Sequence, residues 1–206
     1  SKLPDVDVYV TGSNSQMLSK DIATNFRDRG FEIRLHPLSF SEYIEATGKD
    51  LFNGFEDYLT WGGMPLAVLE KDENERSRYL KGLFDRVYIK DICERHNLRD
   101  DYVINRVVDA LSSSIGSLTN SHKLSNTLQS VLKVKTNDRT INAYLEYLCD
   151  SFLYSRVVRY DVKGKRYFDT PCKYFAEDVG LRNARLNFRQ VEDDHLMENV
   201  IYNELV

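Results

Sequence analysis

The sequence is poor in the residues that cross-link or interrupt small folds, with three cysteines, four prolines and four histidines among 206 residues. The cysteines are odd in number and form no C-x-x-C pair, which argues against a disulfide framework and a zinc ribbon. We therefore expect Cys93, Cys149 and Cys172 to be buried structural thiols. The histidines form no H-E-x-x-H or H-x-E pattern and no G-x-S-x-G occurs, so no metal site is predicted and the signatures of zinc and serine hydrolases are missing.

The sequence also lacks a long apolar run and a strong excess of charge of either sign. No stretch approaches the roughly 18 apolar residues of a membrane span, and no apolar leader opens the chain, so the cytoplasm is the default location. With 42% apolar residues, 29% charged residues and a net charge of −4, the composition is that of a globular protein. At about 150 residues per domain, the length predicts one large domain or two small ones.

The first residues predict a strand, a helix and a second strand. Valines alternate with other residues over 6–10, which predicts a strand that ends in the polar turn 11–14. Apolar residues at near-helical spacing over 17–26 predict a helix, and alternation over 31–35 predicts the second strand. This order is typical of a parallel α/β unit, whose strands normally lie inside a larger sheet.

A family resemblance is carried by short motifs that follow one another in a fixed order. They are Val10-Thr11-Gly12-Ser13-Asn14, Arg29, Pro37-Leu38-Ser39-Phe40, Trp61-Gly62-Gly63-Met64-Pro65, Tyr88-Ile89-Lys90-Asp91-Ile92 with Arg95, and Tyr174 through the Asp178-Val179-Gly180-Leu181 run. Together they resemble the end of the prokaryotic AAA-type P-loop ATPase domain, fused to a conserved C-terminal region of unknown function. The likeness extends from about Val8 to Leu205.

The resemblance implies a nucleotide-sensing role for Ser13 and Asn14, which would face the γ-phosphate, and for Arg29, which would complete the site. It also implies ATP and Mg²⁺ as cofactors of the full-length parent. A P-loop needs the pattern G-x-x-x-x-G-K-[ST], and neither Gly48-Lys49 nor Gly164-Lys165 satisfies it. We therefore expect this chain to be a fragment of an ATPase that is cut inside its nucleotide-binding domain. By itself it should hold no cofactor and should not hydrolyse ATP.

The middle of the chain has helical periodicity. Patterns over 51–58, 74–95 and 102–115 predict amphipathic helices, and a capping box at Ser39 and Glu42 predicts a helix start. In the longest of them, the apolar stripe consists of Tyr79, Leu80, Leu83, Phe84, Val87, Tyr88 and Ile92.

Residues 120–168 predict a helix-turn-helix followed by a β-hairpin. Ser121 is the expected cap of a helix over 121–132, and a polar turn separates it from a second helix over 141–148. The segment 152–160 can pair with 166–168 across a Lys-Gly-Lys turn, as in the wing of a winged helix. The corresponding region of the family also looks like a winged helix.

The sequence leaves open whether this winged helix binds double-stranded DNA or a protein. Residues 154–190 contain nine basic and four acidic residues, an excess of five positive charges. A DNA-binding winged helix would use the second helix in the major groove and the wing on phosphates. The candidate nucleic-acid contacts are then Asn137, Arg139, Thr140, Asn142, Lys163, Lys165 and Arg166. Protein or intramolecular docking is the other interpretation, because the fold does not decide the partner.

The last apolar pattern predicts a helix over 193–205. Glu198-Asn199 and Glu204-Leu205 resemble the start of a restriction-endonuclease-like segment, in which a helical Glu joins later acids around Mg²⁺. Those later acids are absent, so no metal ligand set is complete and no catalytic residue set is complete in this chain. The alternating strand at 6–10 is expected to pair with a neighbour, within the chain or in a second copy.

The predicted fold class is mostly α with small β elements (α+β). Residues 1–46 are expected to be the end of an AAA-type domain, 47–100 a helical linker or lid, 101–190 a winged-helix domain and 191–206 the start of a further segment. The predicted function is that of part of a nucleotide-dependent ATPase whose winged helix couples nucleotide state to a DNA or protein partner. The alternative is a winged-helix nucleic-acid-binding module without ATPase activity.

Overall fold

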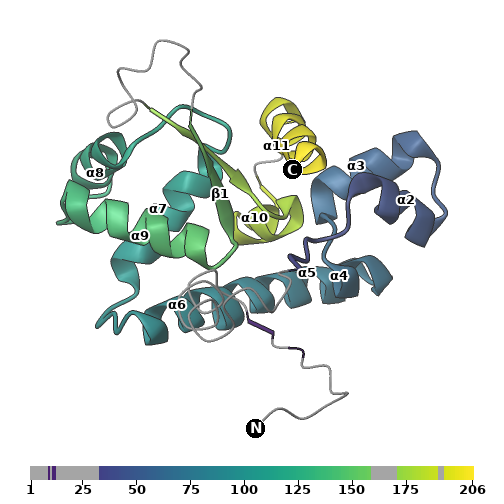
Figure 1. Ribbon diagram of the computed structural model, residues 1–206, viewed down its shortest axis with the longest axis horizontal. Coiled ribbons are helices and arrows are strands. Elements are labelled where there is room, and N and C mark those ends of the chain that lie inside the picture. The colour runs from purple at the N-terminus through teal and green to yellow at the C-terminus, as the bar shows by residue number, and fades with distance from the viewer. Residues whose placement is uncertain (1–8, 10, 13–32, 159–170, 190–192) are drawn as a thin grey trace, which may run out of the picture.

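The structure is a computed structural model that describes residues 9, 11–12, 33–158, 171–189 and 193–206 (Figure 1). The helices are α2 (Phe40–Thr47), α3 (Leu51–Trp61), α4 (Pro65–Leu69), α5 (Glu73–Gly82), η2 (Leu83–Ile89), α6 (Lys90–Arg95), α7 (Tyr102–Ser113), α8 (Ser121–Ser130), α9 (Asp138–Asp150), α10 (Val179–Arg185) and α11 (Asp193–Leu205). Strands β1 (Tyr154–Val157) and β2 (Lys173–Ala176) form an antiparallel pair. The described part is mostly helical with one small sheet, which confirms the predicted α+β class.

Side-chain oxygen atoms mark where most of the longer helices begin. The capping box predicted at the start of α2 is present, because Glu42 N donates to Ser39 Oγ and the Glu42 carboxylate accepts from Ser39 N at 2.8 Å. The predicted cap of α8 was wrong by one residue, since Asn120 is the cap and Ser121 is the first helical residue. The other side-chain caps are Asp50, Asp72, Asn137 and Asp178.

Residues 73–95 run through α5, η2 and α6, but the middle section is a π-helix rather than an α-helix. The wider π winding rotates the residues that follow it relative to an i, i+3/i+4 stripe. Val87, which was predicted to face the core, is therefore 50% exposed, whereas Ile89 is buried. Leu80, Phe84 and Ile92 lie in the core as predicted.

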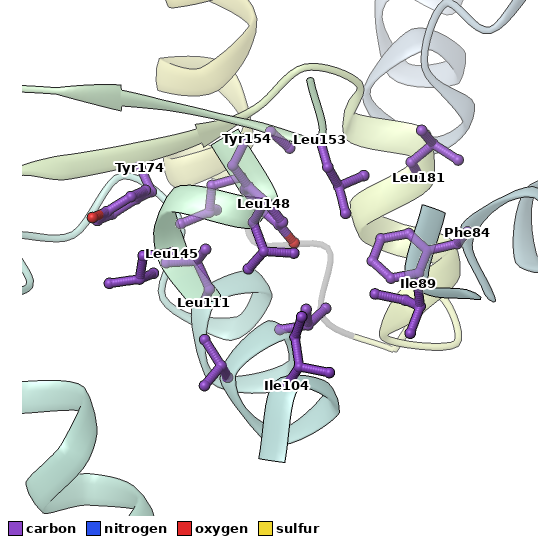
Figure 2. Packing of buried hydrophobic residues seen from close by; sticks show 14 of the residues in the cluster. Phe84, Ile89, Ile104, Leu111, Leu145, Leu148, Leu153, Tyr154, Tyr174 and Leu181 are labelled. Carbon is purple, nitrogen blue, oxygen red and sulfur yellow. The ribbon is translucent and has the colours of Figure 1, made fainter. Parts of the chain in front are cut away.

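The main hydrophobic core lies where α7, α9 and the sheet meet η2 and α10 (Figure 2). Ile104 and Leu111 from α7 meet Leu145 and Leu148 from α9, and all four side chains are buried. A second, smaller cluster joins α2 and α3 to α10 and α11 through Tyr43, Tyr58, Leu59, Val179, Leu196 and Val200. Figure 1 shows the resulting arrangement, with α7, α8 and α9 on one side of the sheet and α11 near α3 on the other.

The sheet register pairs Tyr154 with Ala176 and Val157 with Lys173. Thr119 also forms an isolated antiparallel bridge with Cys172, the residue just before β2. The predicted partner segment 166–168 lies outside the described residues, and within them β1 pairs instead with 173–176. Among the described helices, none is long and apolar enough to cross a membrane.

Candidate functional site

The first turns of α9 carry the four polar residues predicted to contact a partner from the second helix. Asn137 caps the helix, because its side-chain oxygen accepts a hydrogen bond from Thr140 N at 3.0 Å. Asn142 donates to the Glu146 carboxylate at 2.8 Å. Arg139 is exposed and has no hydrogen-bond or ion-pair partner among the residues that the structure describes. Of the four, Arg139 is therefore the side chain most available to a partner molecule.

A histidine joins α8 to the start of α9 beside Arg139. His122 Nδ1 lies 2.8 Å from Asp138 Oδ2, and its Nε2 lies 3.0 Å from Asn126 Nδ2. The hydrogen bond from His122 is the largest cause that holds the pKa of Asp138 below its ordinary value. This arrangement fixes the position of the Asp138 carboxylate at a surface where an unpaired acid would repel an anionic partner.

The remaining predicted contacts lie outside the described residues, so their roles stay predictions. These are the nucleotide-sensing Ser13, Asn14 and Arg29, and the basic residues Lys163, Lys165 and Arg166. The predicted strand at 6–10 is also outside them except for Tyr9, so its pairing with a neighbour stays a prediction as well.

A second cluster gathers around Glu177, directly after β2, and the sequence did not single it out. Arg34 Nη2 lies 2.9 Å from Glu177 Oε1, and His36 Nδ1 lies 3.4 Å from Glu177 Oε2. Ser155 Oγ donates to Glu177 Oε1 from strand β1. The Arg34 guanidinium also lies over the Phe152 ring, 4.8 Å from its centroid. One carboxylate with an 11% exposed side chain thus contacts a segment that is far away in the sequence.

The next residue, Asp178, is buried and binds backbone N–H groups from two segments. Its Oδ1 accepts from Leu181 N and its Oδ2 accepts from Gly63 N, both at 2.7 Å. Burial raises the pKa of Asp178 to about 6, although the N–H groups act in the opposite direction. Gly63 O in turn accepts from Leu38 N at 2.8 Å, so Asp178 is linked through one residue to the segment that contains Arg34.

Two of the motifs that carry the family resemblance meet at Asp178. Gly62 has φ +71°, and a Cβ atom on it would lie 2.4 Å from Asp178 Oδ1. A Cβ atom on Gly180 would lie 1.9 Å from Trp61 O. The G-G-x-P turn and the D-x-G-L turn are therefore packed backbone against backbone, and both need glycine for this contact.

Several other polar side chains that the sequence analysis named, or that lie near them, are held by contacts within the fold. Lys173 forms an ion pair with Glu198, Glu204 accepts from Phe40 N at 2.7 Å, and Asn199 is fully buried. Burial raises the pKa of Cys149 to about 12, which suits a structural thiol. Cys172 is buried, whereas Cys93 and Cys149 are only partly buried, so the expectation of three buried thiols was too strong. Among the described residues, no group of three or more His, Cys, Asp or Glu could hold a metal ion.

Comparison with known proteins divides the chain into two matched parts. Residues 53–192, more than half of the chain, match the family described as "Domain of unknown function (DUF8612)". The chain belongs to the DUF8612 family. Residues 1–44 match a family described as "AAA domain", which supports the expected relation to AAA-type ATPases. Glu177, Asp178 and α9 lie in the DUF8612 part, whereas Arg34, His36 and Leu38 lie in the AAA part.

Two curated relatives are similar over almost the whole chain. An uncharacterized protein of Haemophilus influenzae is 34% identical over 207 residues, which cover 98% of this chain and 51% of the relative. An uncharacterized protein of Methanocaldococcus jannaschii is 27% identical over 211 residues, which cover 97% of this chain and 47% of the relative. The chain therefore spans about half the length of these two relatives. No solved structure matches it.

Proposed function

We propose that this chain is part of a nucleotide-dependent AAA-type ATPase in which a winged-helix domain transmits nucleotide state to a partner. In this proposal Ser13 and Asn14 sense the γ-phosphate, Arg29 completes the site, and residues 101–190 form the winged helix. ATP and Mg²⁺ belong to the complete nucleotide-binding domain. The match of residues 1–44 to an AAA domain supports the first half of the proposal.

The observation that carries the second half is the order and pairing of elements between α7 and β2. A helix is followed by the bridge residue Thr119, then by the helix pair α8 and α9, and then by β1 and β2. Because Thr119 pairs with Cys172, the residue just before β2, the segment formed by Cys172 and β2 lies between Thr119 and β1. The order supports a winged helix, in which short strands close one side of a helix-turn-helix, with the isolated Thr119 bridge standing beside the two strands β1 and β2.

The ATPase proposal is tested by nucleotide binding. A form of the protein that adds the upstream part of the AAA domain to this chain should bind ATP with Mg²⁺ in isothermal titration calorimetry. The 206-residue chain alone is the matched control and should not bind, because it contains no P-loop. Failure of the longer form to bind ATP would show that the proposed relation to nucleotide is wrong.

A second candidate, duplex DNA as the partner, is favoured by the exposed Arg139 side chain in the first turn of α9, which has no hydrogen-bond or ion-pair partner within the described part of the chain. Exposed Lys133 and Lys135 lie in the turn just before that helix, so three basic side chains flank its N-terminal end. An arginine at the start of a recognition helix can bind a guanine edge or a phosphate. Protein docking through the same surface would not depend on these charges to the same extent.

The DNA candidate is tested by the anisotropy of a labelled duplex with the chain as it stands. Replacing Arg139 with alanine should weaken binding about tenfold, since one good base contact contributes about 1–3 kcal/mol. Arg78→Ala is a matched control, because Arg78 is an exposed arginine on α5 that pairs with Glu75. The logarithm of the affinity should also fall linearly with the logarithm of salt concentration. Binding that is absent, or that is independent of salt, would favour a protein partner.

A further inference from the structure

The contacts of Glu177 join the two parts of the chain that match different families. Arg34 and His36 belong to the AAA part, and Glu177 and Ser155 belong to the DUF8612 part. The Glu177 carboxylate contacts Arg34 and His36 on one side and accepts the Ser155 hydroxyl on the other. A single side chain therefore contacts both the end of the AAA part and strand β1.

The backbone of Glu177 is hydrogen-bonded to the residue that precedes β1, so it is tied to the β1–β2 hairpin, the antiparallel pair of strands β1 and β2. Glu177 N donates to Leu153 O at 3.2 Å, just before β1, and Asn203 Nδ2 of α11 donates to Glu177 O at 3.1 Å. Phe152, whose ring lies under the Arg34 guanidinium, directly precedes Leu153 in the sequence. A displacement of Arg34 would thus alter contacts at the residues that lead into β1.

One carboxylate, that of Glu177, is the acidic partner of both Arg34 and His36 at this contact. The Glu177 side chain is 11% exposed, whereas those of Arg34 and His36 are 44% and 39% exposed. An ion pair with one partly buried member is less screened by salt than a surface pair, and a hydrogen bond to a charged group is stronger than a neutral one. Removing the charge of Glu177 should therefore weaken both contacts of the AAA part at once.

We propose that Glu177 is a positioning residue that couples the AAA domain to the β1–β2 hairpin, by holding Arg34 and His36 in one of two positions that depend on nucleotide. This inference rests on the proposed function, because it assumes that ATP binds upstream of Arg34. Coupling of this kind requires that ATP favour one position over the other, so that the ligand and the hairpin bias the same two-state contact.

The test measures amide hydrogen exchange in β1 and β2, with and without ATP and Mg²⁺, in the form that includes the whole AAA domain. In the unmodified protein, ATP should change the exchange rates of these amides by about fivefold or more. In Glu177→Gln and in Arg34→Ala, ATP should still bind, with its affinity changed by no more than the coupling factor of about fivefold, and the response of β1 and β2 should disappear. Arg34→Ala is included because Arg34 is 44% exposed, so its loss leaves the core intact.

Glu198→Gln is the matched control. It removes the partner of Lys173, an ion pair on β2 that does not involve the AAA part, and it should keep the response to ATP. An ATP response that persists in Glu177→Gln would overturn the proposal, and so would ATP binding without any response in the unmodified protein. Failure of ATP to bind at all would overturn the proposed function and the coupling together. Failure of the coupling alone is recognised because ATP still binds in that case.

Discussion

Replacing Asp178 with asparagine should change how the stability of the protein depends on pH. Asp178 is the cap of α10, its side chain is buried, and its two oxygen atoms accept from Leu181 N and Gly63 N. Asparagine keeps one acceptor oxygen but turns an NH₂ group toward the other donor. One buried N–H is then left without an acceptor, which costs about 1–3 kcal/mol of folding free energy.

The pH dependence follows from the raised pKa of Asp178. An acid that binds its proton more tightly in the folded state contributes stability at low pH and loses it as pH rises through the folded pKa. For Asp178 this window extends from its ordinary value of 3.8 to about 6. At 1.36 kcal/mol per pH unit the full effect is about 3 kcal/mol, of which about 2 kcal/mol falls between pH 4.5 and pH 7.5.

The assay is urea denaturation of both proteins at pH 4.5 and pH 7.5. We expect Asp178→Asn to be less stable than the wild type at both values, with the larger difference at pH 4.5. Asp72→Asn is the control, because Asp72 is also a helix cap that accepts from two backbone N–H groups, but it is exposed. A difference that is equal at both pH values, or larger at pH 7.5, would show that the N–H groups outweigh burial and would refute the reasoning.

Two further substitutions address the packing around this junction. Gly180→Ala should destabilise the protein by about 3 kcal/mol or more in urea denaturation, because the new Cβ atom would lie 1.9 Å from the backbone oxygen of Trp61. Gly54→Ala, which meets only the end of a side chain, should cost much less, and equal losses would contradict the argument. Asn199→Ala should cost about 1–3 kcal/mol, because Ala176 N loses its acceptor at 2.8 Å, whereas Ala176 O keeps a hydrogen bond from Asn203 Nδ2 at 3.2 Å. A loss below about 1 kcal/mol would mean that water replaces the lost acceptor.

Local signals were sufficient to predict most of the helices. The Ser39 capping box, the two helices α8 and α9 and the last helix were predicted from capping patterns and apolar spacing, although the cap of α8 was misplaced by one residue. The π-helical section was not predicted, because a stripe of residues three and four apart presupposes α-helical winding. Val87 was consequently assigned to the core and Ile89 was not.

The candidate site was predictable only where its residues are close in sequence. Asn137, Arg139, Thr140 and Asn142 follow one another on a single helix, so spacing alone predicted that they lie together. Spacing could not show that the Asn142 side chain donates to Glu146 while Arg139 has no partner among the described residues, because that depends on side-chain conformation. The sequence therefore predicted the surface, and the structure distinguished the residues within it.

The junction at Glu177 could not be predicted from the sequence for a different reason. Arg34 and Glu177 are 143 positions apart, and neither stands in a local pattern that indicates an ion pair. Asp178 and Gly63 did appear in motifs, but a motif gives only the order of residue types along the chain and does not show which residues are in contact. The structure shows why both motifs need these residues, because the two turns are in contact: Gly63 N donates to Asp178, and Gly180 packs on Trp61. A motif with no evident chemistry of its own can thus reflect a contact between two parts of the chain, and here that contact lies beside the one that joins the AAA and DUF8612 parts.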